Sequence, residues 1–155
     1  MTTPVVTTGK ASRSDLEEIH ALLSSNSLPL DGVADCIDRF IVAKEDGKIV
    51  GCIGLELYEE SALLRSAAVA DGLKGRGIGR MLVNEILAEA EREGAHALYL
   101  LTTTAENYFP AFGFERIERS EIPPELDASE ELKGACPASA IVMRKRLVQA
   151  VRRVS

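Results

Sequence analysis

The chain has 155 residues, of which 46% are hydrophobic, and a formal net charge of −6. This composition is typical of a packed globular protein, and the length fits a single domain covering residues 1–155 with a core of about 4–147. The acidic excess disfavours nucleic acid as a partner. The sequence shows neither an apolar leader nor a run of apolar residues long enough to span a membrane, so we expect a cytoplasmic protein without a membrane partner.

The first third of the chain predicts a short strand, two helices and a hairpin. Residues 4–9 form the strand. Ser14 and Glu17 have the spacing of a capping box at a helix start, and a second short helix is expected over residues 31–37. Residues 39–57 contain two apolar runs separated by Asp46-Gly47, which is a strong signal for a two-residue hairpin turn.

The middle of the chain predicts a βαβ unit. Residues 62–70 are too apolar for a strand with an exposed face, so this strand should lie inside the sheet. The helix that follows begins after Gly77, with one apolar stripe and a stop at Gly94. The stripe consists of Ile78, Leu82, Ile86 and Ala90.

The rest of the chain predicts three strands, a short helix near whose start Pro110 lies, and a surface loop. These strands cover residues 96–104, 113–118 and 138–147, the helix 105–112 and the loop 120–137. Together the elements predict an α/β fold, in the broad sense of an α+β mixed sheet, with one crossover around the central helix.

Residues 74–80, called the glycine turn below, lead into that helix and combine three glycines with three cations. The first amides of a helix have no acceptor inside it and carry a partial positive charge. Phosphate groups satisfy such amides, and glycine allows close approach and unusual dihedral angles. The alternative is a plain turn with solvated cations. The G-x-G-x-G spacing matches neither the P-loop nor the G-x-G-x-x-G dinucleotide pattern.

The glycine turn resembles the coenzyme A motif [Q/R]-x-x-G-x-[G/A] of the GNAT superfamily of N-acetyltransferases, with Lys74 where glutamine or arginine is usual. "AENYFPAFGFERIE" is similar to that family's helix with an asparagine, here Asn107, followed by Gly113-Phe114. The resemblance implies a largely antiparallel mixed sheet with helices on both faces. It also implies acetyl-CoA as cosubstrate, no metal, and a small-molecule amine as acceptor. Cofactor-binding residues would be Ala67, Ala68, Val69, Lys74, Gly75, Arg76, Gly77, Ile78, Gly79, Arg80 and Asn107.

Catalysis in such an enzyme is direct attack of the amine on the thioester. Amides around Ala68 and Val69 would stabilise the oxyanion. We expect Glu56, a polar residue among apolar strand residues, to be the base, because partial burial suits a carboxylate to accept a proton. Many relatives have a tyrosine as general acid where this chain has Phe109. The neighbouring Tyr108 is the candidate acid, although a ring that simply packs on its helix is the alternative.

Arg65 interrupts an otherwise apolar strand and needs a partner. It either pairs with Glu56 as part of the structure or binds a carboxylate or arsonate of the acceptor. Thr102 and Thr103 at the end of the next strand are further acceptor-binding candidates. "GLELYEESALLRSAAVA" and "CPASAIVMRKRL" also resemble the GNAT subgroup associated with bacterial arsenic-resistance operons. That likeness implies an amino acid, or an analogue containing arsenic or phosphorus, as acceptor.

Two other functions remain open at this point. Cys36, Cys52 and Cys136 would supply three thiols to a metalloid-binding protein if the fold gathers them, although the wide spacing is not that of a disulfide framework. Phe109 is compatible with a coenzyme A sensor that has no activity. The resemblance also implies a possible homodimer, since relatives in that family are often dimers, and the final strand over residues 138–147 could pair across its interface.

Overall fold

A computed structural model describes residues 5–129, 132 and 139–147 of the chain. The chain divides into two compact units, which we describe separately. The first comprises Met1–Leu55 and Ser66–Leu87, and the second Glu56–Arg65 and Ala88–Ser155. The single domain expected from the chain length stays a prediction.

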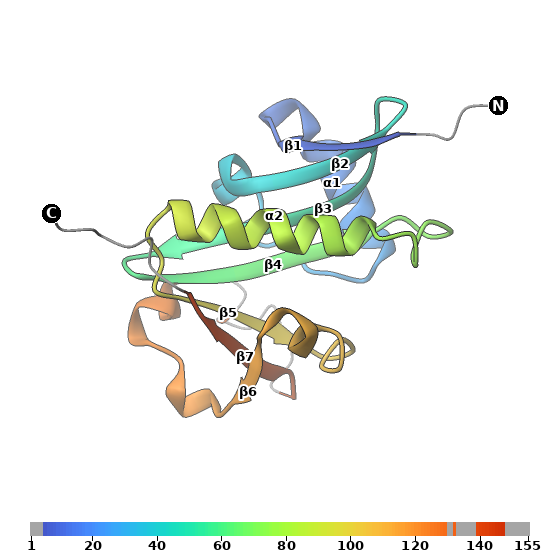
Figure 1. Ribbon diagram of the computed structural model, residues 1–155. Coiled ribbons are helices and arrows are strands. Elements are labelled where there is room, and N and C mark those ends of the chain that lie inside the picture. Colours follow the sequence, from blue (N-terminus) through green and yellow to red (C-terminus); the bar gives the residue numbers. More distant parts are fainter. Residues whose placement is uncertain (1–4, 130–131, 133–138, 148–155) are drawn as a thin grey trace, which may run out of the picture. The chain divides into compact units, whose positions relative to one another are not determined.

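In the part of the chain that the structure describes, seven strands form one mixed sheet in the order β1-β2-β3-β4-β5-β7-β6 (Figure 1). They are β1 (Val6–Lys10), β2 (Phe40–Glu45), β3 (Lys48–Tyr58), β4 (Ser61–Val69), β5 (Ala97–Thr102), β6 (Glu115–Ile117) and β7 (Ile141–Arg146). The α-helices are α1 (Leu16–Ser25) and α2 (Ile78–Arg92). Short 3-10 helices are η1 (Arg13–Asp15), η2 (Ala34–Arg39), η3 (Phe109–Phe112), η4 (Arg119–Glu121) and η5 (Pro124–Ala128). The mixed sheet and the crossover through α2 confirm the predicted fold class.

In the first unit, the β2–β3 hairpin turns at Asp46-Gly47 as predicted. Glu45 pairs with Lys48, so the loop has two residues. Both have positive φ, 54° at Asp46 and 77° at Gly47, which is the left-handed combination that a right-twisted hairpin requires.

Successive residues of β3 in this unit face α2 and α1 in turn. A Cβ at Gly51 would lie 3.0 Å from Leu82 and 3.1 Å from Ile78, both on α2. Cys52, the next residue, belongs instead to a core with Ile19 and Leu23 of α1. Because neighbouring strand residues point to opposite faces, α1 and the first turns of α2 cover opposite faces of this part of the sheet (Figure 1).

In the second unit, β7 is an inner strand. It pairs antiparallel with β5 over Ala97–Thr102 and with β6 over Glu115–Ile117. Within the described residues, both edges of β7 therefore pair with strands of the same chain, and the homodimer stays a prediction. A core of Leu63, Tyr99, Ile117, Leu126 and Val142 packs beside these strands.

Two predicted helix starts differ from the observed ones. The capping box is formed by Ser12 and Asp15, not by Ser14 and Glu17: Ser12 N–H donates to Asp15 Oδ2 at 2.9 Å, and η1 precedes α1. Both residue pairs have the spacing of a capping box. The box forms at the earlier pair because helical structure begins there, with η1 at Arg13. The second short helix is the 3-10 helix η2, shifted toward the C-terminus. Pro110 lies in the first turn of η3, as predicted.

Candidate functional site

The glycine turn adopts a backbone that only glycine accommodates easily. Gly75 and Gly77 have φ of 86° and 84°, and a Cβ built at either would have no atom within 4 Å. Backbone conformation, not crowding by the protein, therefore requires glycine at both positions. The expectation of unusual dihedrals was wrong at Gly79, which lies within α2.

The turn ends at the positive end of α2. Met81 N–H donates to Gly77 O at 3.1 Å. The N–H groups of Ile78 and Gly79 precede this bond, so they have no acceptor within the helix itself. Together with the helix dipole, this geometry suits an anionic group.

Two cations of the turn contact the protein at its surface. Lys74 Nζ lies 3.0 Å from Asn26 Oδ1 and 3.6 Å from Asp71 Oδ1. Arg76 Nη2 lies 3.2 Å from Glu45 Oε2, with 41% of its side chain exposed. Exposed pairs of this kind contribute at most about 1 kcal/mol, so a bound anion can compete for these side chains.

Strand β4 bends just before the glycine turn. Ser66 is buried and has a φ of 61°, which is costly for a residue other than glycine inside a strand. Cys52 Sγ donates to Ser66 O at 3.4 Å. Further on, Ala70 N–H donates to Val50 O at 2.8 Å. Strand amides alternate in direction. Ala68 N–H therefore points toward β3, like Ala70 N–H, whereas Val69 N–H points away from β3.

Glu56, Tyr58 and Arg65, called the Glu56 cluster below, form a polar group in the second unit. Arg65 Nη1 donates to Glu56 Oε2 at 2.6 Å, and the Tyr58 hydroxyl donates to Glu56 Oε1 at 2.6 Å. The side chains of Arg65 and Glu56 are 0% and 6% exposed. Of the two predicted roles of Arg65, the structure shows the ion pair with Glu56.

Sequence reasoning missed Tyr58. Residues two apart on a strand share a face, so the "ELY" stretch already placed Tyr58 beside Glu56. Both carboxylate oxygens of Glu56 thus have donors. Each oxygen keeps a second lone pair, so the carboxylate can still accept a proton.

The remaining candidates of the second unit lie around β5 and η3. Thr102 Oγ1 accepts from Ala105 N–H at 2.8 Å and from Thr104 N–H at 3.3 Å, so its hydroxyl caps a turn. Thr103 and Asn107 are exposed.

The aromatic residues of η3 differ in exposure. Tyr108 is 43% exposed, and the centroid of its ring lies 5.2 Å from that of Phe109 and 5.3 Å from that of Phe112. Phe109 is 5% exposed and packs on Phe114. Tyr108 is therefore a ring that packs on its neighbours and also reaches solvent.

The two described cysteines are core residues. Cys36 and Cys52 belong to the same hydrophobic cluster, and burial raises the pKa of the Cys52 thiol to about 12. Cys136 lies outside the described residues. A buried thiol that stays protonated is a poor ligand for a soft metal or metalloid.

In the described part of the chain, no group of three or more His, Cys, Asp or Glu residues is arranged to hold a metal ion. Among the same residues, no helix has the length and apolar character needed to cross a membrane.

Comparison with known proteins identifies the family. The profile of the acetyltransferase (GNAT) family matches residues 12–114, and the chain belongs to that family. It is 30% identical over 98 residues to an uncharacterized N-acetyltransferase of Chlorobaculum tepidum, covering 63% of each chain. It is 34% identical over 91 residues to an amino-acid acetyltransferase of Aeromonas salmonicida, covering 57% of this chain and 21% of that one. These alignments span less than two thirds of either relative.

A solved structure shows the same fold. The N-acetylglutamate synthase of Neisseria gonorrhoeae, complexed with coenzyme A and N-acetyl-glutamate, superposes with a TM-score of 0.80 at 22% identity. The superposition covers 96% of this chain and 36% of that one.

Proposed function

We propose that this chain is an N-acetyltransferase that moves the acetyl group of acetyl-CoA to the amine of a small molecule. The observation that carries the proposal is the glycine turn, where left-handed Gly75 and Gly77 lead into the first amides of α2. The family to which the chain belongs and the coenzyme A in the related Neisseria structure support it. The diphosphate would be held by the amides of Ile78 and Gly79, with Lys74, Arg76 and Arg80 adding charge-assisted contacts.

The reaction requires the amine to lose a proton. The α-amine of a peptide has a pKa of about 7.7–8.0, so roughly a tenth of it is free base near neutral pH. The amine of a free amino acid is more basic and depends more on a general base. Its nitrogen attacks the thioester carbonyl, the carbon–sulfur bond breaks, and the amine loses a proton. Coenzyme A leaves as a thiolate, whose pKa of about 8.5 makes an acid helpful but not essential. We assign the oxyanion contact to Val69 N–H and keep Tyr108 as the candidate acid.

Glu56 is the proposed base, and Tyr58 is its link to the amine. The Tyr58 hydroxyl donates to Glu56, and Tyr58 is half-buried, whereas the other donor, Arg65, is buried. We therefore assign Tyr58 as the group that passes the proton of the amine to Glu56. Tyr58→Phe should lower kcat by about 10²–10⁴-fold and change the pH profile, with little effect on coenzyme A affinity. An unchanged kcat in a folded Tyr58→Phe variant would rule out proton transfer from the amine through Tyr58.

The acceptor we propose is an amino acid, since several relatives carry the name amino-acid acetyltransferase. A narrower proposal is a glutamate analogue that contains arsenic or phosphorus, with Thr102, Thr103 or Arg65 at its acidic group. Arg65 would first have to release Glu56, so this role is more demanding than the ion pair seen here. We also propose a homodimer, with an interface other than the edges of β7.

The test is release of free coenzyme A from acetyl-CoA, followed with DTNB, across a panel of amines. The panel includes amino acids, arsenic- and phosphorus-containing analogues, polyamines and peptide N-termini, with a blank lacking amine. Turnover on amino acids is expected. Binding of coenzyme A by calorimetry without turnover would favour the sensor, and turnover limited to polyamines or peptides would overturn the acceptor assignment.

A metalloid-binding protein is the remaining alternative, and it has its own test. Binding of arsenite that is lost when all three cysteines are replaced by serine would favour it over acetyl transfer. The core positions of Cys36 and Cys52 speak against this outcome.

A further inference from the structure

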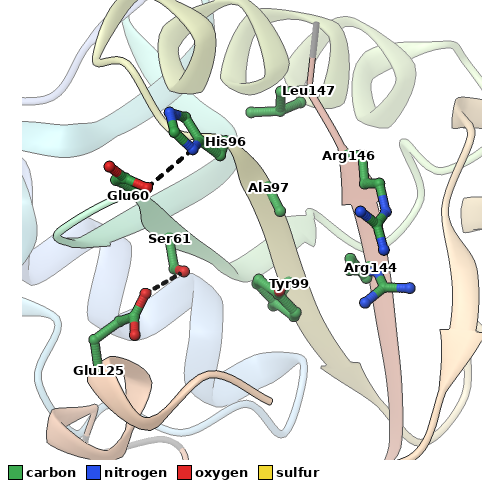
Figure 2. Close-up of a pocket in the computed structure, with 9 residues that line it drawn as sticks. All are labelled: Glu60, Ser61, His96, Ala97, Tyr99, Glu125, Arg144, Arg146 and Leu147. Atoms are coloured by element: carbon green, nitrogen blue, oxygen red, sulfur yellow. Dashed lines mark hydrogen bonds and ion pairs between the residues drawn. The ribbon is translucent and has the colours of Figure 1, made fainter. Parts of the chain in front are cut away.

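A cavity of about 440 Å³ lies in the second unit, and none of its lining residues belongs to the Glu56 cluster or to the other candidate residues of this unit. The starts of β4 and β5, the end of β7 and η5 provide its walls (Figure 2). Its size is within the range of about 300–1,000 Å³ that is usual for sites of small molecules.

The register of the sheet fixes which side chains line one side of this cavity. Ala97 pairs with Arg146, and Tyr99 pairs with Arg144. Paired residues share a face, as do residues two apart on a strand. The two arginines therefore lie side by side next to Ala97 and Tyr99, as Figure 2 shows.

The two arginines differ in their partners. Arg144 Nη2 lies 3.3 Å from Glu115, and its Nη1 lies 3.8 Å from Glu121. Burial disfavours the charge on Arg144, but hydrogen bonds to Glu115 and Tyr99 outweigh it and raise its pKa. Its Nε is buried and has no acceptor among the described residues. Arg146 is exposed, and within residues 5–129, 132 and 139–147 its guanidinium makes neither a hydrogen bond nor an ion pair.

An acidic residue on the opposite wall is also without a counter-ion. Glu125 Oε2 accepts a hydrogen bond from the Ser61 hydroxyl at 2.8 Å, which is a neutral partner, and no cation of the described segments pairs with it. The neighbouring Glu60 differs, because it pairs with His96 Nδ1 at 3.0 Å. In Figure 2 the carboxylates of Glu60 and Glu125 lie on one side and both guanidinium groups on the other.

We propose that this cavity binds a free α-amino acid as a zwitterion, separately from acetyl transfer. The carboxylate of the ligand would accept charge-assisted hydrogen bonds from Arg146, and its ammonium group would donate to Glu125. Ala97 and Leu147 offer apolar surface to its side chain. A single anion would be attracted by Arg146 but repelled by Glu125. A single cation would be attracted by Glu125 but repelled by Arg146. The unpaired charges of opposite sign thus select a ligand that carries both.

The experiment is calorimetric titration of the full-length protein, without acetyl-CoA, with the twenty amino acids at neutral pH. Each amino acid that binds is compared with its α-amide, which lacks the carboxylate, and with its N-acetyl form, which lacks the ammonium group. Binding should weaken about tenfold or more for both capped forms, because each loses a hydrogen bond between charged groups. Equal binding of the N-acetyl form or of inorganic phosphate would mean a simple anion site and overturn the proposal.

Variants separate this site from the acceptor site of the proposed enzyme. Arg146→Gln and Glu125→Gln should each weaken binding about tenfold or more and leave acetyl transfer unchanged. Matched controls are Arg116→Gln on β6 and Asp127→Asn on η5, both exposed residues outside the cavity, which should change neither. Binding that survives both cavity variants, or the absence of binding by any amino acid, would overturn the proposal even if the enzyme is active.

Discussion

The glycine turn and the Glu56 cluster are both rich in charge, but they hold their charges in opposite ways. Lys74 and Arg76 lie at the surface, with 58% and 41% of their side chains exposed, and their partners are 3.0–3.6 Å away. Arg65 and Glu56 are buried and lie 2.6 Å apart. Surface pairs can be exchanged for a ligand at little cost, whereas separating a buried pair leaves an uncompensated charge. The turn is therefore suited to bind, and the cluster to hold a fixed geometry.

The largest effect is expected when the buried pair is broken on one side only. Arg65→Leu should lower the free energy of unfolding by about 3–5 kcal/mol, because Glu56 keeps its charge and loses its partner. Adding Glu56→Gln should recover most of the loss, since the amide is neutral and still accepts from Tyr58. Urea denaturation followed by circular dichroism measures both. A loss below about 1 kcal/mol in the single variant would remove the contrast with the surface pairs.

The next effect concerns the backbone of the glycine turn. Gly77→Ala should cost about 1–2 kcal/mol, because φ of 84° is unfavourable for a residue with a Cβ. Gly94→Ala is the matched control: Gly94 has φ of 86°, and its Cβ would likewise meet no atom within 4 Å. Both variants should lose similar stability, but only Gly77→Ala should weaken coenzyme A binding measured by calorimetry. Equal coenzyme A affinities of the two variants would mean that the glycine turn does not bind the cofactor.

Asp15 is an intermediate case, a buried charge held by the backbone. A hydrogen bond from Ser12 N–H lowers the pKa of the Asp15 carboxyl, burial opposes this, and Lys44 at 3.5 Å adds to the lowering. Asp15→Ala should therefore cost about 0.5–2 kcal/mol at pH 7. Because the pKa of Asp15 is lower in the folded state than the unfolded value of 3.8, its carboxylate stabilises the fold at pH values above 3.8. This stabilisation is lost as the pH falls through the folded-state pKa. The difference from the unmodified protein should shrink in that window, and a constant difference would assign the effect to packing.

The smallest effect on stability is expected at the surface. Arg76→Gln should change the free energy of unfolding by about 0.2–1 kcal/mol, since it removes only an exposed pair with Glu45. Coenzyme A affinity should fall by more than this, and the fall should diminish at high salt, where exposed charges are screened. If Arg76→Gln leaves the coenzyme A affinity unchanged at low salt, Arg76 does not contact the cofactor.

Local sequence signals predicted most elements of the fold. Asp46-Gly47 specified the hairpin because few residue pairs accept two positive φ values. The largely apolar run over 62–70 predicted that β4 lies inside the sheet. The glycines at 75 and 77 indicated left-handed backbone just before a helix. Each of these features depends on a few neighbouring residues, which is why a single sequence reveals it.

The details that the sequence did not reveal depend on contacts between distant segments. Ser66 has positive φ without being a glycine or asparagine, so nothing local predicts the bend in β4. The inner position of β7 follows from its pairing with both β5 and β6, whereas its sequence would fit an edge equally well. The sequence predicted that Arg65 needs a partner, and only the register of β3 and β4 decided that Glu56 and Tyr58 complete the cluster.

The inner position of β7 has a consequence for synthesis of the chain on the ribosome. Strands β5 and β6 emerge first, but the strand that joins them arrives only with Ile141–Arg146. Until then β5 and β6 each expose an unpaired edge, which is a template for wrong pairing with other chains. Conditions that slow translation of residues 118–146 should therefore raise the demand for chaperones more than the same delay in the β2–β3 hairpin, whose two strands are made consecutively.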